Sequence, residues 1–188
     1  MLQHSKLKKL MQMAYSAEKA AAYAYQGHAA SVSDPEEKQA IARIEQDEWE
    51  HRASVLELMR EYNVPVSHWL EWKFAVIGRV ISASCHVIGW FMPFYFAGWL
   101  ESGNVCEYFR MLQYFGELGI SKHDSLLFEM GMKEKEHEVF FRDGLKGHKL
   151  LPLFERFFSW GHETSLNDVD ENRPPSIRES RSYCQRDD

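Results

Sequence analysis

Cysteine is scarce in this chain, and its few copies exclude several kinds of site. Cys85, Cys106 and Cys184 form no Cys-x-x-Cys pair, and three residues cannot complete a set of disulfides. We therefore expect a reducing compartment, in which each thiol is a small core residue or is simply exposed. The same count argues against an appended iron site built on four cysteines.

Positive charge is also in deficit. The 188 residues carry 22 Lys and Arg against 28 Asp and Glu, which gives a formal net charge of −6. General attraction to nucleic acid is therefore not expected. No uninterrupted apolar run follows the lysines of the first fifteen residues, so we expect no secretory signal and a cytoplasmic location. The length fits one domain with a sizeable core.

Proline and glycine are absent from the first 26 residues, which favours a long helix over about 2–30. Glu18 lies within the apolar stripe of this helix, where a solvated charge is not expected. Asp34 or Ser33 is expected to cap a second helix that begins at Pro35 and runs to about Tyr62. Its predicted inward stripe also contains charge-bearing residues and reads Ile41, Ile44, Glu48, His51, Val55 and Leu58.

Charge is missing altogether from residues 80–100, a run of 21 residues that prompts the question of a membrane span. Serine, histidine and Pro93 lower its apolarity, so we favour a buried crossover that also lies at a membrane surface. A true membrane span is the alternative, and the sequence leaves open whether a homodimer buries this stretch. The high aromatic content, 14%, fits either a large apolar interior or a path for an apolar substrate.

A third long helix is predicted from about Pro93 to Leu118, with Gly119 as its C-cap glycine. Residues 121–124 predict a capping box, with Asp124 in the place of glutamate, for a fourth helix over about 122–144. A short apolar helix is expected within 150–160. The composition of residues 161–188 is polar and favours a disordered tail after an ordered domain of residues 1–160.

Two copies of a Glu-x-x-His spacing carry the chemistry of the sequence. Glu48 and His51, like Glu134 and His137, lie one helical turn apart and therefore point the same way. Glu18 lies about 15 residues before the turn at 33–34, and Glu48 about 15 residues after it. At a rise of ~1.5 Å per residue, the two carboxylates reach the same height in a helical hairpin. Glu101 stands in the same relation to the second motif across Gly119.

In a four-helix bundle this arrangement gathers four carboxylates and two imidazoles in one buried layer. Four buried anions without cations would be very costly, whereas two divalent metal ions would balance them. Mixed carboxylate and imidazole ligation suits iron or manganese and permits oxygen to bind. The pattern is that of di-iron carboxylate bundles. The alternative is a bundle in which the acids form buried salt bridges, although few Lys or Arg share these stripes.

Further polar residues near the predicted layer have more than one interpretation. Tyr25 and Tyr108 each follow a ligand glutamate by seven residues, so they are either hydrogen-bond donors behind the ligands or plain core tyrosines. The remaining residues are expected to be ordinary polar, capping or solvent-facing groups, or supports behind the ligands. They are His28, His86, His123, His148, Arg52, Glu107, Glu129, Glu136 and Glu138.

The ligand order Glu, Glu-x-x-His, Glu, Glu-x-x-His resembles the ferritin-like di-iron superfamily. More closely, residues 10–160 resemble the demethoxyubiquinone hydroxylase family in the Glu18 to Glu48 spacing, the apolar crossover, and Tyr108 seven residues after Glu101. The resemblance implies a ferritin-like four-helix bundle and an oxygen-dependent hydroxylase of a polyprenyl quinone precursor, peripheral to the membrane. Its iron ligands correspond to Glu18, Glu48, His51, Glu101, Glu134 and His137. The chain departs from the family at Ser102 and Glu107, outside these six positions.

We therefore expect an enzyme, a di-iron monooxygenase that uses the six residues both as metal ligands and as the catalytic centre. Its cofactor would be two iron ions, with manganese as the alternative. Its partners would be oxygen, a lipophilic substrate, an external electron donor and the inner face of the cell membrane. Two other hypotheses stay open, namely a ferritin-like peroxide-reducing or iron-handling protein and a membrane-associated helical module without activity.

Overall fold

The computed structural model describes residues 3–158 and Trp160, and all regular secondary structure in this part of the chain is helical. The predicted all-α class is confirmed. The predicted tail over 161–188, with Cys184, lies outside the described residues. The chain divides into two compact units, residues 1–93 and 94–188, which we call the N-terminal unit and the C-terminal unit.

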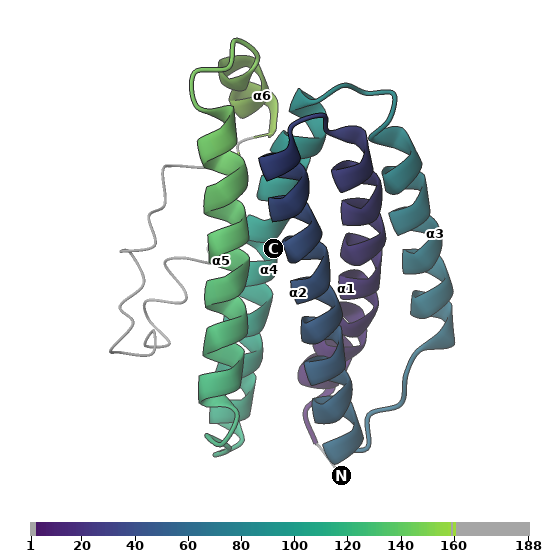
Figure 1. Ribbon diagram of the computed structural model, residues 1–188. Helices are drawn as coiled ribbons and strands as arrows, with labels where there is room; N and C mark the ends of the chain where they lie inside the picture. Colours follow the sequence, from purple (N-terminus) through teal and green to yellow (C-terminus); the bar gives the residue numbers. More distant parts are fainter. Residues whose placement is uncertain (1–2, 159, 161–188) are drawn as a thin grey trace. The chain divides into compact units, whose positions relative to one another are not determined.

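The N-terminal unit contains three helices, α1 (Ser5–Ser31), α2 (Pro35–Glu61) and α3 (His68–Ser84). Helix α1 packs against both α2 and α3 and lies between them (Figure 1). The predicted turn between the first two helices is confirmed. Asp34 is the N-cap of α2, and its carboxylate accepts hydrogen bonds from the backbone N–H groups of Glu36 and Glu37, both at 2.9 Å.

Two glycines set the distance between α1 and α3. A β-carbon added at Gly78 would lie 2.5 Å from the carbonyl oxygen of Ala20, and one added at Gly27 would collide with the backbone of Ser82. Any larger side chain at either position would therefore push the two helix axes apart. The close approach leaves α3 with a narrow buried face, which consists of Ala75 and Gly78.

The rest of α3 differs from the prediction of a buried crossover. Trp69, Trp72 and Val80 expose 65%, 60% and 64% of their surface because α3 packs on α1 with one face only. The charge-free run also does not form one element, since α3 ends at Ser84 and the next helix begins at Phe91. Among the described residues, none of the helices combines the length and the apolarity that crossing a membrane requires.

The C-terminal unit holds a second helical hairpin. Helix α4 (Phe91–Glu117), which starts just before the unit boundary, is followed by α5 (Asp124–Leu145) and the short α6 (Leu151–Phe158). Phe94 near the start of α4 meets Phe141 near the end of α5, with ring centroids 5.5 Å apart. Phe109 and Phe128, further from these ends, stack at 6.0 Å. The two helices therefore run antiparallel.

The turn between α4 and α5 matches the prediction at one end only. Gly119 has a φ of 71°, the left-handed conformation expected of a C-cap glycine. The predicted capping box is wrong, because the N-cap of α5 is His123 and no side chain caps the helix. The backbone N–H of Asp124 instead donates to the carbonyl of Ser121 at 3.1 Å, so Ser121 belongs to a turn that precedes the helix.

Candidate metal centre

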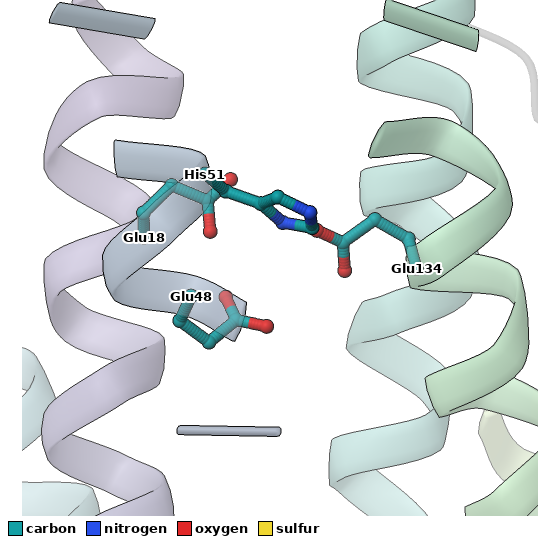
Figure 2. A group of neighbouring side chains, drawn as sticks. All are labelled: Glu18, Glu48, His51 and Glu134. Carbon is teal, nitrogen blue, oxygen red and sulfur yellow. The ribbon is translucent and has the colours of Figure 1, made fainter. Parts of the chain in front are cut away.

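The first hairpin brings together three of the predicted ligands. Glu18 of α1 and Glu48 and His51 of α2 each offer a ligand atom, and these atoms lie within 4.8 Å of one another. Figure 2 shows the carboxylates and the ring extending away from the backbones of α1 and α2. All three residues are buried, with 3%, 0% and 6% of their surface exposed. We call Glu18, Glu48 and His51 the first triad.

The register of α1 against α2 explains why these side chains meet. Gln26 donates a hydrogen bond to Glu45 at 2.9 Å, and Arg52 donates one to the backbone carbonyl of Tyr15. Residues that lie later on α1 therefore pair with residues that lie earlier on α2. Glu18 of α1 consequently lies opposite the part of α2 that carries Glu48 and His51. The number of residues that separate Glu18 and Glu48 from the loop at 33–34 predicted this.

The second hairpin repeats this arrangement with an equivalent set of residues. Glu101 of α4 and Glu134 and His137 of α5 also offer ligand atoms within 4.8 Å of one another, and all three residues are buried. Glu134 extends from α5 as drawn in Figure 2. The Nδ1 atom of His137 lies 3.7 Å from a carboxylate oxygen of Glu134, and Asn104 donates to Glu101 at 2.9 Å. We call Glu101, Glu134 and His137 the second triad.

The donor set of each triad fits a divalent transition metal. Two carboxylates and one imidazole supply hard oxygen ligands together with a nitrogen ligand, the combination that iron and manganese accept. Two carboxylates that share one buried site repel each other when both are ionised, unless a cation or a shared proton separates them. A bound divalent ion would remove this repulsion within each triad. Both triads are therefore chemically suited to hold metal.

The basic residues that follow the ligands in sequence are engaged elsewhere. Lys19 and Arg52 both bind the carboxylate of Glu71, and Lys135 binds Glu138 at 2.7 Å. These cations follow Glu18, His51 and Glu134 directly in the chain, and neighbouring residues of an α-helix differ by about 100° in direction. Each of these three cations therefore has an acid outside the triads within salt-bridge distance.

A buried network lies beside the second triad. The carboxylate of Glu138 accepts hydrogen bonds from Lys135 and from the indole N–H of Trp160, at 2.7 Å and 3.0 Å. Trp160 packs against Gly98 so closely that a β-carbon there would overlap its ring. The prediction left Glu138 either behind the ligands or facing solvent. The structure excludes a solvent-facing position, because only 3% of the surface of Glu138 is exposed.

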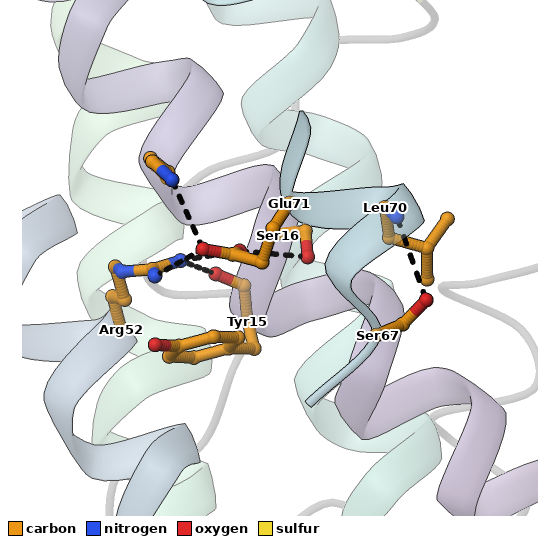
Figure 3. A network of polar contacts seen from close by, with 7 residues as sticks. Tyr15, Ser16, Arg52, Ser67, Leu70 and Glu71 are labelled. Carbon is orange, nitrogen blue, oxygen red and sulfur yellow. Dashed lines mark hydrogen bonds and ion pairs between the residues drawn. The ribbon is translucent and has the colours of Figure 1, made fainter. Parts of the chain in front are cut away.

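A second network, around Glu71, was missed by the sequence reasoning altogether (Figure 3). Burial by itself would raise the pKa of Glu71, but hydrogen bonds from Arg52, Lys19 and Ser16 outweigh it and lower the pKa to about 2. A signal for this residue does exist in the sequence. Glu71 is the only acid between Pro65 and Leu100, and a lone acid in an apolar segment needs a partner.

The other predicted residues take several positions. Tyr25 and Tyr108 are both buried, which agrees with either of the roles left open for them. His28 is buried against Tyr25, and its burial lowers its pKa to about 4. His148 accepts a hydrogen bond from the backbone N–H of Leu150, a local capping role. His86, Glu129 and Glu136 are exposed, whereas His123 is buried and Arg52 and Glu107 are partly buried.

Comparison of the whole chain with models of protein families, with curated proteins and with solved structures finds no match. The two triads and their surroundings are therefore the features of this chain that bear on its function.

Proposed function

We propose that the two triads together hold two divalent metal ions, and that the protein is a di-iron monooxygenase that hydroxylates a lipophilic substrate. The observation that carries this proposal is the repetition of one donor set. Each hairpin supplies two buried carboxylates and one buried imidazole with ligand atoms within 4.8 Å. Four carboxylates would balance the charge of two divalent ions. With both ions bound, the two hairpins would form a ferritin-like four-helix bundle.

The roles of the residues follow from their positions. Glu18, Glu48 and His51 would hold one side of the centre, and Glu101, Glu134 and His137 the other. Iron bound by these groups would supply the activation of oxygen, with electrons from an external donor. The burial of all six side chains would keep bulk water away from the reacting atoms. The antiparallel register of each hairpin would keep the donors at one height without further adjustment.

The residues on the exposed face of α3 favour the proposal that the substrate is lipophilic and is taken from a membrane surface. Trp69, Trp72 and Val80 lie on this face, and the exposed charged residues of α3 are both positive, Lys73 and Arg79. Glu71, the one acid of α3, binds Arg52 and Lys19 instead. Aromatic rings together with cations suit the interface of an anionic bilayer. The resemblance to demethoxyubiquinone hydroxylases leads us to propose a polyprenyl quinone precursor as the substrate.

Metal content and oxygen use test the proposal directly. The purified full-length chain should bind about two iron ions, and in the presence of a reductant and a short-chain quinone precursor it should consume oxygen and add a hydroxyl group to the ring. Glu18→Gln and Glu101→Gln, one in each triad, should both lower the iron content and abolish turnover. Glu136→Gln, an exposed change on α5, is the matched control and should behave as wild type.

Three results would count against the assignment. Full iron content in both ligand variants would show that the triads are not the metal centre. Two bound ions with peroxide consumption, but without hydroxylated product, would favour a peroxide-reducing or iron-handling protein. Protein that binds no metal but associates with vesicles would favour a helical module without activity.

A further inference from the structure

Glu71 joins two residues that directly follow predicted metal ligands. Lys19 follows Glu18 on α1, and Arg52 follows His51 on α2. Both side chains end on the carboxylate of Glu71, which comes from the third helix of the N-terminal unit. One carboxylate therefore connects all three helices next to the first triad.

The contacts leave this carboxylate little freedom. The Nη1 and Nη2 atoms of Arg52 donate to separate oxygens of Glu71, at 3.0 Å and 2.7 Å. Lys19 donates to one of these oxygens at 3.0 Å, and the hydroxyl of Ser16 donates to the other at 2.9 Å (Figure 3). Arg52 also donates to the carbonyl of Tyr15, and its guanidinium lies 3.6 Å from the centre of the Tyr15 ring. A bidentate contact between a guanidinium and a carboxylate fixes the relative orientation of the two groups as well as the distance between them.

Helical geometry turns these contacts into a constraint on the ligands. Neighbouring residues of an α-helix differ by about 100° in direction and ~1.5 Å in height. When Lys19 is held toward α3, the direction and the height of Glu18 on α1 are set as well. Arg52 does the same for His51 on α2. The close glycine contacts between α3 and α1 leave the two helices no room to move closer, which limits how far Glu71 can shift toward Lys19.

We propose that Glu71 is a positioning residue for the first triad, which it keeps in a metal-binding arrangement by holding Lys19 and Arg52. The inference rests on the proposed function, since it requires the triad to bind metal. Residues that orient metal ligands from behind commonly change metal affinity by about 10- to 100-fold when they are replaced. We therefore expect loss of the Glu71 contacts to weaken metal binding by about tenfold.

Cobalt(II) provides a test that does not depend on enzyme activity. The full-length chain, freed of metal, is titrated with cobalt(II) well below its melting temperature, and the visible absorption of the bound ion reports both affinity and ligand geometry. Glu71→Gln removes the charge, whereas Glu71→Asp keeps the charge but shortens the side chain. Both should weaken binding by about tenfold and change the visible spectrum. Glu136→Gln, which removes the exposed pair with Lys133, is the control and should match wild type.

The outcomes separate positioning from other roles. If both Glu71 variants melt at lower temperature but bind cobalt with the wild-type affinity and spectrum, Glu71 is only structural and the inference is wrong. If Glu71→Asp matches wild type while Glu71→Gln does not, charge rather than position matters, and the inference is again wrong. If Glu71→Gln does not fold, Lys19→Met, which keeps the Glu71–Arg52 pair, should still weaken binding and alter the spectrum. A wild-type chain that binds no cobalt would refute the proposed metal centre itself.

Discussion

Acid should destabilise this protein through His28, a residue outside both triads. The side chain is 2% exposed and stacks on Tyr25, and burial lowers its pKa from 6.5 to about 4. The unfolded chain therefore binds a proton at His28 between pH 6.5 and 4, while the folded chain does not. His28 therefore lowers the free energy of unfolding progressively as the pH falls from 6.5 toward 4, and it has no such effect above pH 6.5.

The size of this effect follows from the difference in pKa. One pKa unit corresponds to 1.36 kcal/mol, so a difference of this size amounts to about 3 kcal/mol between pH 7 and pH 4. This is a large part of the 5–15 kcal/mol by which native domains are stable. Wild type contains other titratable residues as well, so its total loss of stability is not specific to His28.

A matched variant isolates the residue. His28→Gln cannot titrate, so urea unfolding of wild type and variant at several values between pH 7 and pH 4 should give two curves of different slope. We expect the free energy of unfolding of wild type to fall by about 3 kcal/mol more than that of the variant over this range. Parallel curves would show that His28 is equally free to take up a proton in the folded and unfolded chain, which would refute the reasoning.

Two further predictions concern packing and the outward face of α3. Gly98→Ala should cost about 1–3 kcal/mol of stability and shift the fluorescence of Trp160, because the new methyl group overlaps its ring. Gly103→Ala, on the same helix with open space around it, should be neutral or stabilising, and equal losses in the two variants would contradict the packing argument. Replacing Trp69 and Val80 together by Gln should reduce co-sedimentation with anionic vesicles at unchanged helix content. Equal sedimentation of wild type and variant would show that this face does not bind lipid.

The helices could be predicted from the sequence because their signals are local. The cap at Asp34 and the left-handed Gly119 depend on neighbouring residues alone, and both occur as expected. The predicted capping box does not form. Ser121 and Asp124 have the right spacing for it, but their backbones are hydrogen-bonded to each other in a turn. Periodicity also identified the buried acids Glu18 and Glu48, since charge within an apolar stripe is visible without any tertiary information.

What could not be predicted depends on how distant segments pack. Apolar residues such as Trp69, Trp72 and Val80 are typical of a buried helix face, so their exposure follows only from the way α3 packs against α1. The contact of Glu71 with Arg52 likewise joins residues 19 positions apart on different helices. Trp160 lies 22 positions from Glu138, and the short apolar helix expected within 150–160 does not indicate which residue its indole contacts.

The way α3 is seated has a consequence for the behaviour of the protein in water. An exposed apolar face of a helix can be buried by rotation of the helix about its own axis. Here such a roll would pull Glu71 from Arg52 and would bring larger side chains to the place where Gly78 now touches Ala20. The outward tryptophans of α3 are therefore a fixed trait of the folded N-terminal unit, and only something outside that unit can shield them from solvent.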